Sequence, residues 1–280
     1  MSMNEYELEL LEQQREYKVV KSNKLVLNSR YHYSLAEQKS IAYICSLIKP
    51  IDTANPPEGG YQLKYEFSIA DYIRLIGVES SGNQYQLVKS SLESLSEKKM
   101  WLPIEDENGK GEVLVRWLSN VALYKRSGKV KIKIDEYFAP YLFALQSQYL
   151  SYGLINILNF KSKYGLRLYE ILKAKYDMLR SVSNRQRYET PEFEWVVELD
   201  ELKRLLMLDG EYHRYPDFRI KVLETAQRDI NGLSDMLFDF EPITKGRKTV
   251  KVKFKMRMKD CMERLKAGAE NDKLLNKGMK

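Results

Sequence analysis

The segment 244–259 carries the densest group of side chains that could do chemistry. Eight of its sixteen residues are basic and none is acidic. From Lys251 to Lys259 cationic and apolar residues alternate, and a strand would place them on opposite faces because successive side chains point to opposite sides. A row of cations can bind the phosphates of a nucleic acid. It can also keep an exposed edge strand from pairing with another chain, so both interpretations stay open for this segment alone.

Residues that could carry catalysis are few. His32 and His213 are the only histidines and lie far apart, so the pair of nearby metal ligands that a rolling-circle nuclease needs is missing. Gly77 and Gly82 have the spacing of a nucleotide-binding loop, but the lysine of such a loop does not follow. The 20 tyrosines are explained more simply as core and surface aromatic residues. We therefore expect no enzyme activity, no cofactor and no metal.

The composition indicates a globular protein. The chain has 280 residues, of which 44% are hydrophobic and 30% charged, enough for one large or two ordinary domains. The first twenty residues are acidic and polar, unlike a secretory signal, and no apolar run approaches the ~20 residues that span a bilayer. Cys45 and Cys261 have no partner motif, which is typical of a reducing compartment. We expect a cytoplasmic protein without a membrane contact.

The net charge of +7 is distributed unevenly. Residues 1–150 hold 19 basic and 19 acidic side chains, whereas residues 151–280 hold 27 and 20. The whole excess therefore lies in the second half, and the segment 244–259 supplies most of it. A localised excess of positive charge favours a polyanionic partner.

The elements that would position these cations occur twice in the same order: helix, strand, short helix, longer helix and hairpin. Helix caps, apolar periodicity and turn residues define them. In the first copy a capping box at Ser34 and Glu37 opens the series, which is expected at 35–48, 61–67, 69–77, 84–98 and 100–135. The last of these ranges would hold strands at 100–105, 112–125 and 129–135. In the second copy Ser162 and Asp200 are the expected caps, and the series falls at 163–179, 193–199, 201–208, 216–231 and 236–259.

This order predicts a DNA-binding architecture. The short and the longer helix would form a helix-turn-helix pair, and the hairpin beside them a wing. In such a module the longer helix can enter the major groove while the wing touches the DNA backbone or the minor groove. We expect an α+β protein with two tandem winged-helix domains related by internal duplication, at residues 1–150 and 151–265. Residues 266–280 would be a tail, either helical or disordered.

The second copy has the side chains for DNA recognition. Its longer helix would bury a stripe formed by Phe218, Val222, Ala226, Ile230 and Leu233. Arg and Lys can bind guanine and Glu can accept from cytosine, so the opposite side is suited to base readout, although an ordinary solvated face is the alternative. Cations on the wing turn and on the preceding short helix would bind phosphates. The expected DNA contacts are Lys221, Glu224, Arg228 and Arg219 on the helix, Lys245, Arg247 and Lys248 on the turn, and Lys203 and Arg204 on the short helix.

The first copy is less suited to DNA. Its longer helix exposes Gln86, Ser90, Glu93 and Glu97, and the turn 105–111, taken as the turn of its wing, is acidic. A structural or protein-contact role is as well supported for this copy as DNA contact.

Three blocks of the sequence, in a fixed order, resemble a known family. They are residues 17–48, residues 161–173 (KSKYGLRLYEILK), and residues 202–231 with the following 240–254 (FEPITKGRKTVKVKF). Together they resemble the iteron-binding plasmid replication initiators of the Rep_3 type over most of residues 17–258. The resemblance implies two winged-helix domains that bind repeated origin sequences, called iterons. It also implies a monomer that starts replication and a dimer that represses its own promoter.

The same resemblance assigns roles to the two domains. It places the main DNA-binding module at residues 203–228 and 245–248, and it gives the first domain the dimer contact and a weaker DNA contact. The acidic turn in the first domain differs from the family's pattern and does not favour a strong DNA contact there.

The sequence thus predicts a non-enzymatic binder of double-stranded DNA that initiates plasmid replication. It would bend or crowd the origin, help to melt an adjacent A·T-rich segment, and recruit host replication proteins such as the replicative helicase, a step that only the resemblance implies. The alternative is a dimeric winged-helix transcriptional repressor. Footprints over direct repeats at an origin favour the initiator, and a lone palindromic operator favours the repressor.

Overall fold

The protein is described by a computed structural model that covers residues 17–28, 32–48, 60–76, 84–143, 145, 149–183 and 190–277. The chain forms two compact units, Met1–Leu154 and Ile155–Lys280. The expectations about residues 1–16 and about the glycines Gly77 and Gly82 concern positions outside the described residues. Within the described ranges, no helix has the length and apolar character needed to cross a membrane.

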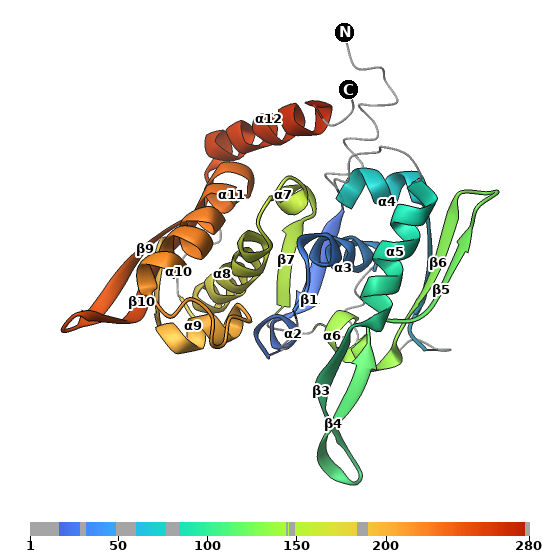
Figure 1. The fold of residues 1–280 in the computed structure, drawn as a ribbon, viewed down its shortest axis with the longest axis horizontal. Helices are drawn as coiled ribbons and strands as arrows, with labels where there is room; N and C mark the ends of the chain where they lie inside the picture. Colours follow the sequence, from blue (N-terminus) through green and yellow to red (C-terminus); the bar gives the residue numbers. More distant parts are fainter. Residues whose placement is uncertain are drawn as a thin grey trace. The chain divides into compact units, whose positions relative to one another are not determined.

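Unit 1 contains three small antiparallel sheets and a group of helices (Figure 1). Strand β1 (Lys18–Ser22) pairs with β7 (Tyr149–Gly153), which closes the beginning and the end of the unit together. The remaining elements are α2 (Asn23–Asn28), α3 (Leu35–Leu47), β2 (Lys64–Ser68), α4 (Ile69–Ile76), α5 (Gln84–Glu97), β3 (Lys99–Asp106), β4 (Gly109–Arg116), β5 (Leu118–Tyr124), β6 (Lys129–Ile134), a 3-10 turn (Glu136–Phe138) and α6 (Ala139–Leu142).

The capping box predicted at the start of α3 is present, and it also connects α3 to α5. Ser34 Oγ accepts from the Glu37 amide at 3.2 Å, and Glu37 Oε2 accepts from the Ser34 amide at 2.7 Å. The other oxygen of Glu37 accepts from the Ser94 hydroxyl of α5 at 2.6 Å, so one carboxylate fixes two helices. Burial raises the pKa of Glu37, but the hydrogen bonds from Ser94 and Ser34 outweigh it and leave the pKa below its usual value.

Unit 2 repeats the helix-rich plan with a longer hairpin. Its elements are α7 (Ile155–Leu158), α8 (Lys163–Ser181), β8 (Phe193–Glu198), α9 (Leu199–Leu205), α10 (Tyr215–Phe218), a π-helical segment (Arg219–Glu224), α11 (Thr225–Leu233), β9 (Met236–Lys245), β10 (Lys248–Met258) and α12 (Cys261–Lys277). The tail after residue 265 is therefore helical through Lys277. Asn271 on α12 is buried and donates to the Leu233 carbonyl at 2.7 Å, which satisfies an acceptor at the end of α11.

The two units share one topology. Strand β2 leads directly into α4, and the sheet has the order β2-β6-β5; strand β8 leads directly into α9, and that sheet has the order β8-β10-β9. The central strands β6 and β10 carry the similar hexamers KVKIKI and KVKFKM, so this likeness in sequence marks equivalent positions. The shared order agrees with internal duplication.

This topology corrects the wing expected in the first copy. Strands β3 and β4 form a separate two-stranded sheet that lies in sequence between α5 and the β5–β6 hairpin. The acidic turn therefore belongs to an additional hairpin, and the wing position of unit 1 is taken by β5–β6. The expected single strand 112–125 is divided at Trp117, which is buried and stacks on Phe138 at 4.2 Å between ring centroids.

Local signals placed most helix starts correctly, with one exception. Ser162 caps α8 as expected, accepting from the Tyr164 and Gly165 amides at 3.2 Å each. Asp200 does not cap α9: the helix begins at Leu199 with Glu198 as its N-cap residue, and Asp200 lies in the first turn. The expectation was wrong because β8 runs directly into α9 without a loop.

Candidate nucleic-acid interface

The candidate interface is built on the long helix of unit 2, residues 215–233, here called the recognition helix. Pro216 lies in its first turn, where a missing amide hydrogen costs nothing. Its apolar stripe is buried as predicted: Phe218, Val222, Ala226, Ile230 and Leu233 are all at most 9% exposed. The helix runs two residues beyond the expected end.

The middle of the recognition helix is a π-helical segment, which the sequence did not indicate. The Thr225 hydroxyl donates to the carbonyl of Ile220, five residues earlier, at 3.1 Å. The wider turn allows Val222 and Leu223 to be buried side by side in sequence, both at 0% exposure. Such segments occur often at functional sites.

The outward side of the recognition helix carries most of the predicted contacts. Lys221 and Arg228 are exposed, and the guanidinium of Arg228 makes a long contact of 3.5 Å to Thr225 Oγ1. Arg219 and Glu224 lie next to each other and form an ion pair, with Nε and Oε1 3.2 Å apart. Ile220 is 52% exposed between two cations.

Two anchors fix the recognition helix in unit 2. Gln227 and Asn231 both donate to the Phe238 carbonyl on β9, at 3.0 and 2.9 Å, and Asn231 also accepts from the Phe238 amide. Asp229 Oδ2 accepts from the amides of Lys161 and Ser162 at 3.0 and 2.8 Å, just before α8. The helix is thus held between the wing and the start of α8, so its outward side chains are presented from a rigid support.

The wing is the β9–β10 hairpin, which projects from the helices of unit 2 (Figure 1). Its stem carries the alternating cations, and these face carboxylates of the protein itself. Lys251 pairs with Glu198 at 2.7 Å; Lys253 and Lys255 both pair with Glu241, at 3.2 and 3.1 Å. The stem cations are defined as Lys251, Lys253, Lys255 and Arg257.

The fourth stem cation is the most firmly paired. Both nitrogens of the Arg257 guanidinium end donate to Glu263 at 2.7 Å, and Glu263 also accepts from the Asp260 amide. The hydrogen bonds from Arg257 lower the pKa of Glu263 to about 2. The stem cations therefore pair with acidic side chains of the protein itself. This favours the interpretation in which the row of cations stabilises the hairpin and does not bind a polyanion.

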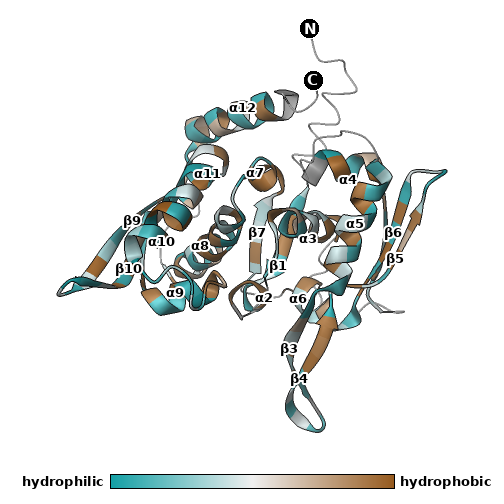
Figure 2. Ribbon diagram, viewed as in Figure 1, coloured by the Kyte–Doolittle hydropathy of each residue, from teal (hydrophilic) through white to brown (hydrophobic). Residues whose placement is uncertain are grey.

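The turn of the wing differs from its stem. Lys245, Arg247 and Lys248, here called the tip cations, are exposed, and no ion pair involves them among the described residues. Gly246 occupies the turn with φ +62°, a conformation that glycine adopts without strain. This end of the hairpin is hydrophilic, as Figure 2 shows. Positive charge that is free to meet phosphates is therefore concentrated at the tip.

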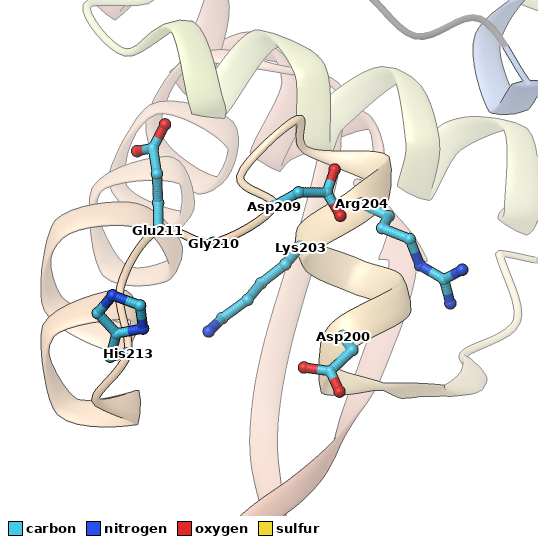
Figure 3. A pocket seen from close by; sticks show the side chains of 7 residues that line it. All are labelled: Asp200, Lys203, Arg204, Asp209, Gly210, Glu211 and His213. Carbon is cyan, nitrogen blue, oxygen red and sulfur yellow. The ribbon is translucent and has the colours of Figure 1, made fainter.

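The two cations expected on the short helix are engaged within unit 2. Lys203 Nζ donates to the Tyr212 carbonyl at 2.8 Å, and Arg204 pairs with Glu201 at 2.6 Å. In Figure 3, Lys203 extends toward the loop that carries His213, while Arg204 points away from it. Both side chains line a polar pocket together with Asp200, Asp209, Gly210, Glu211 and His213. Three carboxylates make this pocket a poor site for phosphate, so phosphate contacts by Lys203 and Arg204 stay predictions.

The turn between α9 and the recognition helix is conformationally demanding. Tyr212 has φ +50° and Met207 φ +59°, unusual values for residues with side chains. Tyr212 is held by the Lys203 contact, by its hydroxyl against that of Tyr164 at 3.3 Å, and by an edge-to-face contact with Phe218. These contacts set the angle at which the recognition helix leaves the turn.

In unit 1 the equivalent wing tip is basic. The β5–β6 turn exposes Lys125 and Arg126, here called the unit-1 tip cations, and they form no ion pair among the residues the structure describes. On the adjoining strands Glu66 pairs with Lys129 at 2.6 Å and with Lys131 at 3.4 Å, the same neutral-stem arrangement as in unit 2. Sequence reasoning missed this tip because it took the acidic turn for the wing.

One residue of the recognition helix was also missed. Ile220 lies opposite the buried stripe, where a helical wheel alone would have found it, and an exposed aliphatic side chain can contact a thymine methyl group.

In the described ranges, no three His, Cys, Asp or Glu side chains gather as ligands for a metal ion.

Comparisons with known proteins match both units. The family described as "Initiator Replication protein, WH1" matches residues 18–173, and that described as "Initiator Rep protein, WH2" matches residues 198–256. A curated "Replication initiation protein" of Escherichia coli is 26% identical over 218 residues, 78% of this chain. The match takes in 63% of that relative's length.

Among solved structures, the crystal structure of the Pi initiator protein in complex with iteron DNA is similar, with a TM-score of 0.65 at 20% identity. The similarity covers 88% of this chain and 99% of the other. At that identity it shows a common fold. The predicted α+β fold with two winged-helix domains is confirmed.

Proposed function

Because this chain belongs to the initiator replication protein family, with its WH1 and WH2 domains, we propose that it binds repeated sequences of a plasmid origin and starts replication there. The similarity to an initiator solved with iteron DNA supports this substrate. Opening of the origin, recruitment of host proteins such as the replicative helicase, and repression of its own gene extend the proposal. No catalytic step is part of it.

The observation that carries the proposal is the distribution of free positive charge in unit 2. The stem cations face the protein's own carboxylates, whereas the tip cations and the exposed Lys221 and Arg228 do not. Lys and Arg in the major groove can bind guanine O6 and N7, and cations at a wing tip can neutralise phosphates. We assign base readout to Lys221 and Arg228, with Ile220 against a thymine methyl, and backbone contact to the tip cations.

Unit 1 would add a second backbone contact. Its β5–β6 turn has the same place in the topology as the wing of unit 2, and its unit-1 tip cations are exposed. The recognition-helix equivalent α5 exposes Glu93 and Glu97, which suit base readout poorly. We therefore propose that unit 1 contacts phosphates through β5–β6 and contributes little sequence preference.

The additional hairpin of unit 1 is the proposed surface for self-association. Trp101 and Leu114 lie directly opposite each other on β3 and β4 and are 59% and 44% exposed. Strand β4 has a visibly hydrophobic stretch in Figure 2. Exposed tryptophan is typical of residues that dominate protein interfaces. Since the acidic turn disfavours DNA, a second copy of the chain is the partner proposed for this hairpin.

The central experiment measures binding to the origin fragment of the source plasmid at several salt concentrations. Replacing the three tip cations by glutamine should lower the slope of log affinity against log salt by about 3, because each lost phosphate contact accounts for ~0.9. Replacing Lys251, Lys253 and Lys255 by glutamine is the matched control and should change the slope by less than about 1. Replacing the two unit-1 tip cations should lower it by about 2. If the stem variant changes the salt slope as much as the variant of the three tip cations, the assignment of phosphate contacts to the tip cations is refuted.

Footprinting tests the initiator against a repressor of the same fold. Protection of several direct repeats supports initiation, and protection of a single palindrome supports the repressor.

A further inference from the structure

We propose that Glu224 is a specificity-determining residue that restrains Arg219 until the recognition helix meets a suitable base. The inference rests on the proposed function and deepens it. From the sequence, Glu224 is expected as a base contact and Arg219 as an assisting cation. The structure joins the two, and their pairing gives the carboxylate a second effect on DNA binding.

The pair exists because of the π-helical segment. Arg219 and Glu224 are five residues apart, whereas side chains that meet on a regular α-helix are three or four apart. A π-helical turn is closed by hydrogen bonds between residues i and i+5, which brings these two residues closer together than on a regular helix. Arg219 opens the segment and Glu224 closes it, which brings Nε and Oε1 to 3.2 Å. A regular helix at this position would separate the two charges.

The pair is exposed and can open. The side chains of Arg219 and Glu224 are 49% and 43% exposed, and solvent-exposed pairs of this kind are weak. Arg219 can therefore leave Glu224 for a stronger, bidentate partner such as guanine. Between Arg219 and Arg228 on the outward side of the helix, Glu224 is then the carboxylate that remains near the DNA.

Glu224 opposes binding to most sequences. DNA carries a dense negative charge, so an unpaired carboxylate in the groove is repelled and loses its water. Only a base with an amino group in the major groove, foremost cytosine N4, can donate to it and offset this loss. Such a carboxylate weakens binding to most sequences, but a few sequences offer it a hydrogen-bond donor. The difference in affinity between these few sequences and the rest therefore increases. Glu224 would thus lower non-specific affinity in two ways: by holding Arg219 and by repelling phosphates.

The test compares the wild-type chain with Glu224→Gln on two DNA fragments, the origin of the source plasmid and a scrambled fragment of equal length and composition. We expect Glu224→Gln to bind the scrambled fragment about 3–10-fold more tightly and to lose about tenfold in preference for the origin. Its salt slope on scrambled DNA should become steeper by ~0.9, since the freed Arg219 neutralises one more phosphate. Far-UV circular dichroism and thermal unfolding establish that the variant is folded.

Two further variants separate this mechanism from a general charge effect. Glu270→Gln on α12 removes the same charge from another exposed pair, with Lys273 at 3.6 Å, and should leave slope and preference unchanged. In an Arg219→Gln background, Glu224→Gln should steepen the salt slope by much less than ~0.9, because only the repulsion of phosphates is then removed. If Glu224→Gln fails to fold, Glu224→Ala replaces it in the same comparison.

The possible outcomes distinguish this inference from the proposed function. A wild-type chain without preference for origin DNA contradicts the proposed function itself. A wild-type chain with that preference, whose Glu224→Gln variant keeps both preference and slope, overturns the inference alone. A slope change of undiminished size in the Arg219→Gln background also overturns it, because Glu224 would then not act through Arg219.

Discussion

Replacing Gly165 by alanine tests how the recognition helix is held against α8. A β-carbon at this position would lie 3.0 Å from Asp229 Oδ2 and 3.3 Å from Asp229 Cβ, tighter than normal contact. Asp229 would have to move, and it now accepts from the Lys161 and Ser162 amides. The sequence motif 161–173 therefore contains a glycine where the recognition helix approaches α8.

The magnitude follows from two opposing effects. Alanine in a helix is favoured over glycine by about 1 kcal/mol. Hydrogen bonds to a charged group contribute about 1.5–3 kcal/mol each, so losing one or both outweighs that gain. We expect Gly165→Ala to destabilise unit 2 by about 1–3 kcal/mol. In an Asp229→Ala background the carboxylate contact is gone and only the 3.3 Å contact with the β-carbon of residue 229 remains, so the same substitution should cost less or stabilise by up to ~1 kcal/mol.

The assay is a double-mutant cycle followed by denaturant unfolding and hydrogen exchange. Trp195 is the one tryptophan of unit 2, so its fluorescence reports that unit once Trp101 and Trp117 are replaced by phenylalanine. The amides of Lys161 and Ser162 should exchange faster in both single variants. If Gly165→Ala stabilises the wild-type background as much as the Asp229→Ala background, Asp229 does not restrain this contact and the reasoning is refuted.

Two other predictions concern self-association and pH. Trp101→Ser should weaken self-association measured by sedimentation, whereas Val182→Ser, a change at another exposed apolar residue, should not; equal effects would contradict the proposed surface. The pKa of Glu263 is lowered to about 2 by its arginine partner, so its contribution to stability is present above its usual pKa and is lost as pH falls toward 2. Wild type and Glu263→Gln should therefore differ in melting temperature at pH 6 and converge near pH 2; a constant difference would contradict this coupling.

Local sequence signals predicted most of the helices and the basic turn. Capping at Ser34 and Ser162 depends on residues within one turn, and the apolar stripe of the recognition helix follows from helical spacing alone. The two tandem modules were also predictable, because the order of elements repeats.

Long-range pairing was what the sequence could not supply. The partners of Lys251 and Lys253 come from neighbouring strands, and their positions depend on a register that no local pattern specifies. Any hairpin with a polar turn resembles a wing, so β3–β4 was mistaken for one until the pairing of β2 with β6 was known. The π-helical segment likewise depends on packing, which places Val222 and Leu223 in the core together.

The amide of Asn271 has a practical consequence for anyone who shortens this protein. A chain cut at residue 265, where the modular pattern of the sequence ends, would lack the donor that satisfies the Leu233 carbonyl and the partner of the Asn159 side chain. The smallest fragment of the second unit that folds on its own should therefore include the turn of α12 that contains Asn271. Affinity tags belong beyond that turn as well.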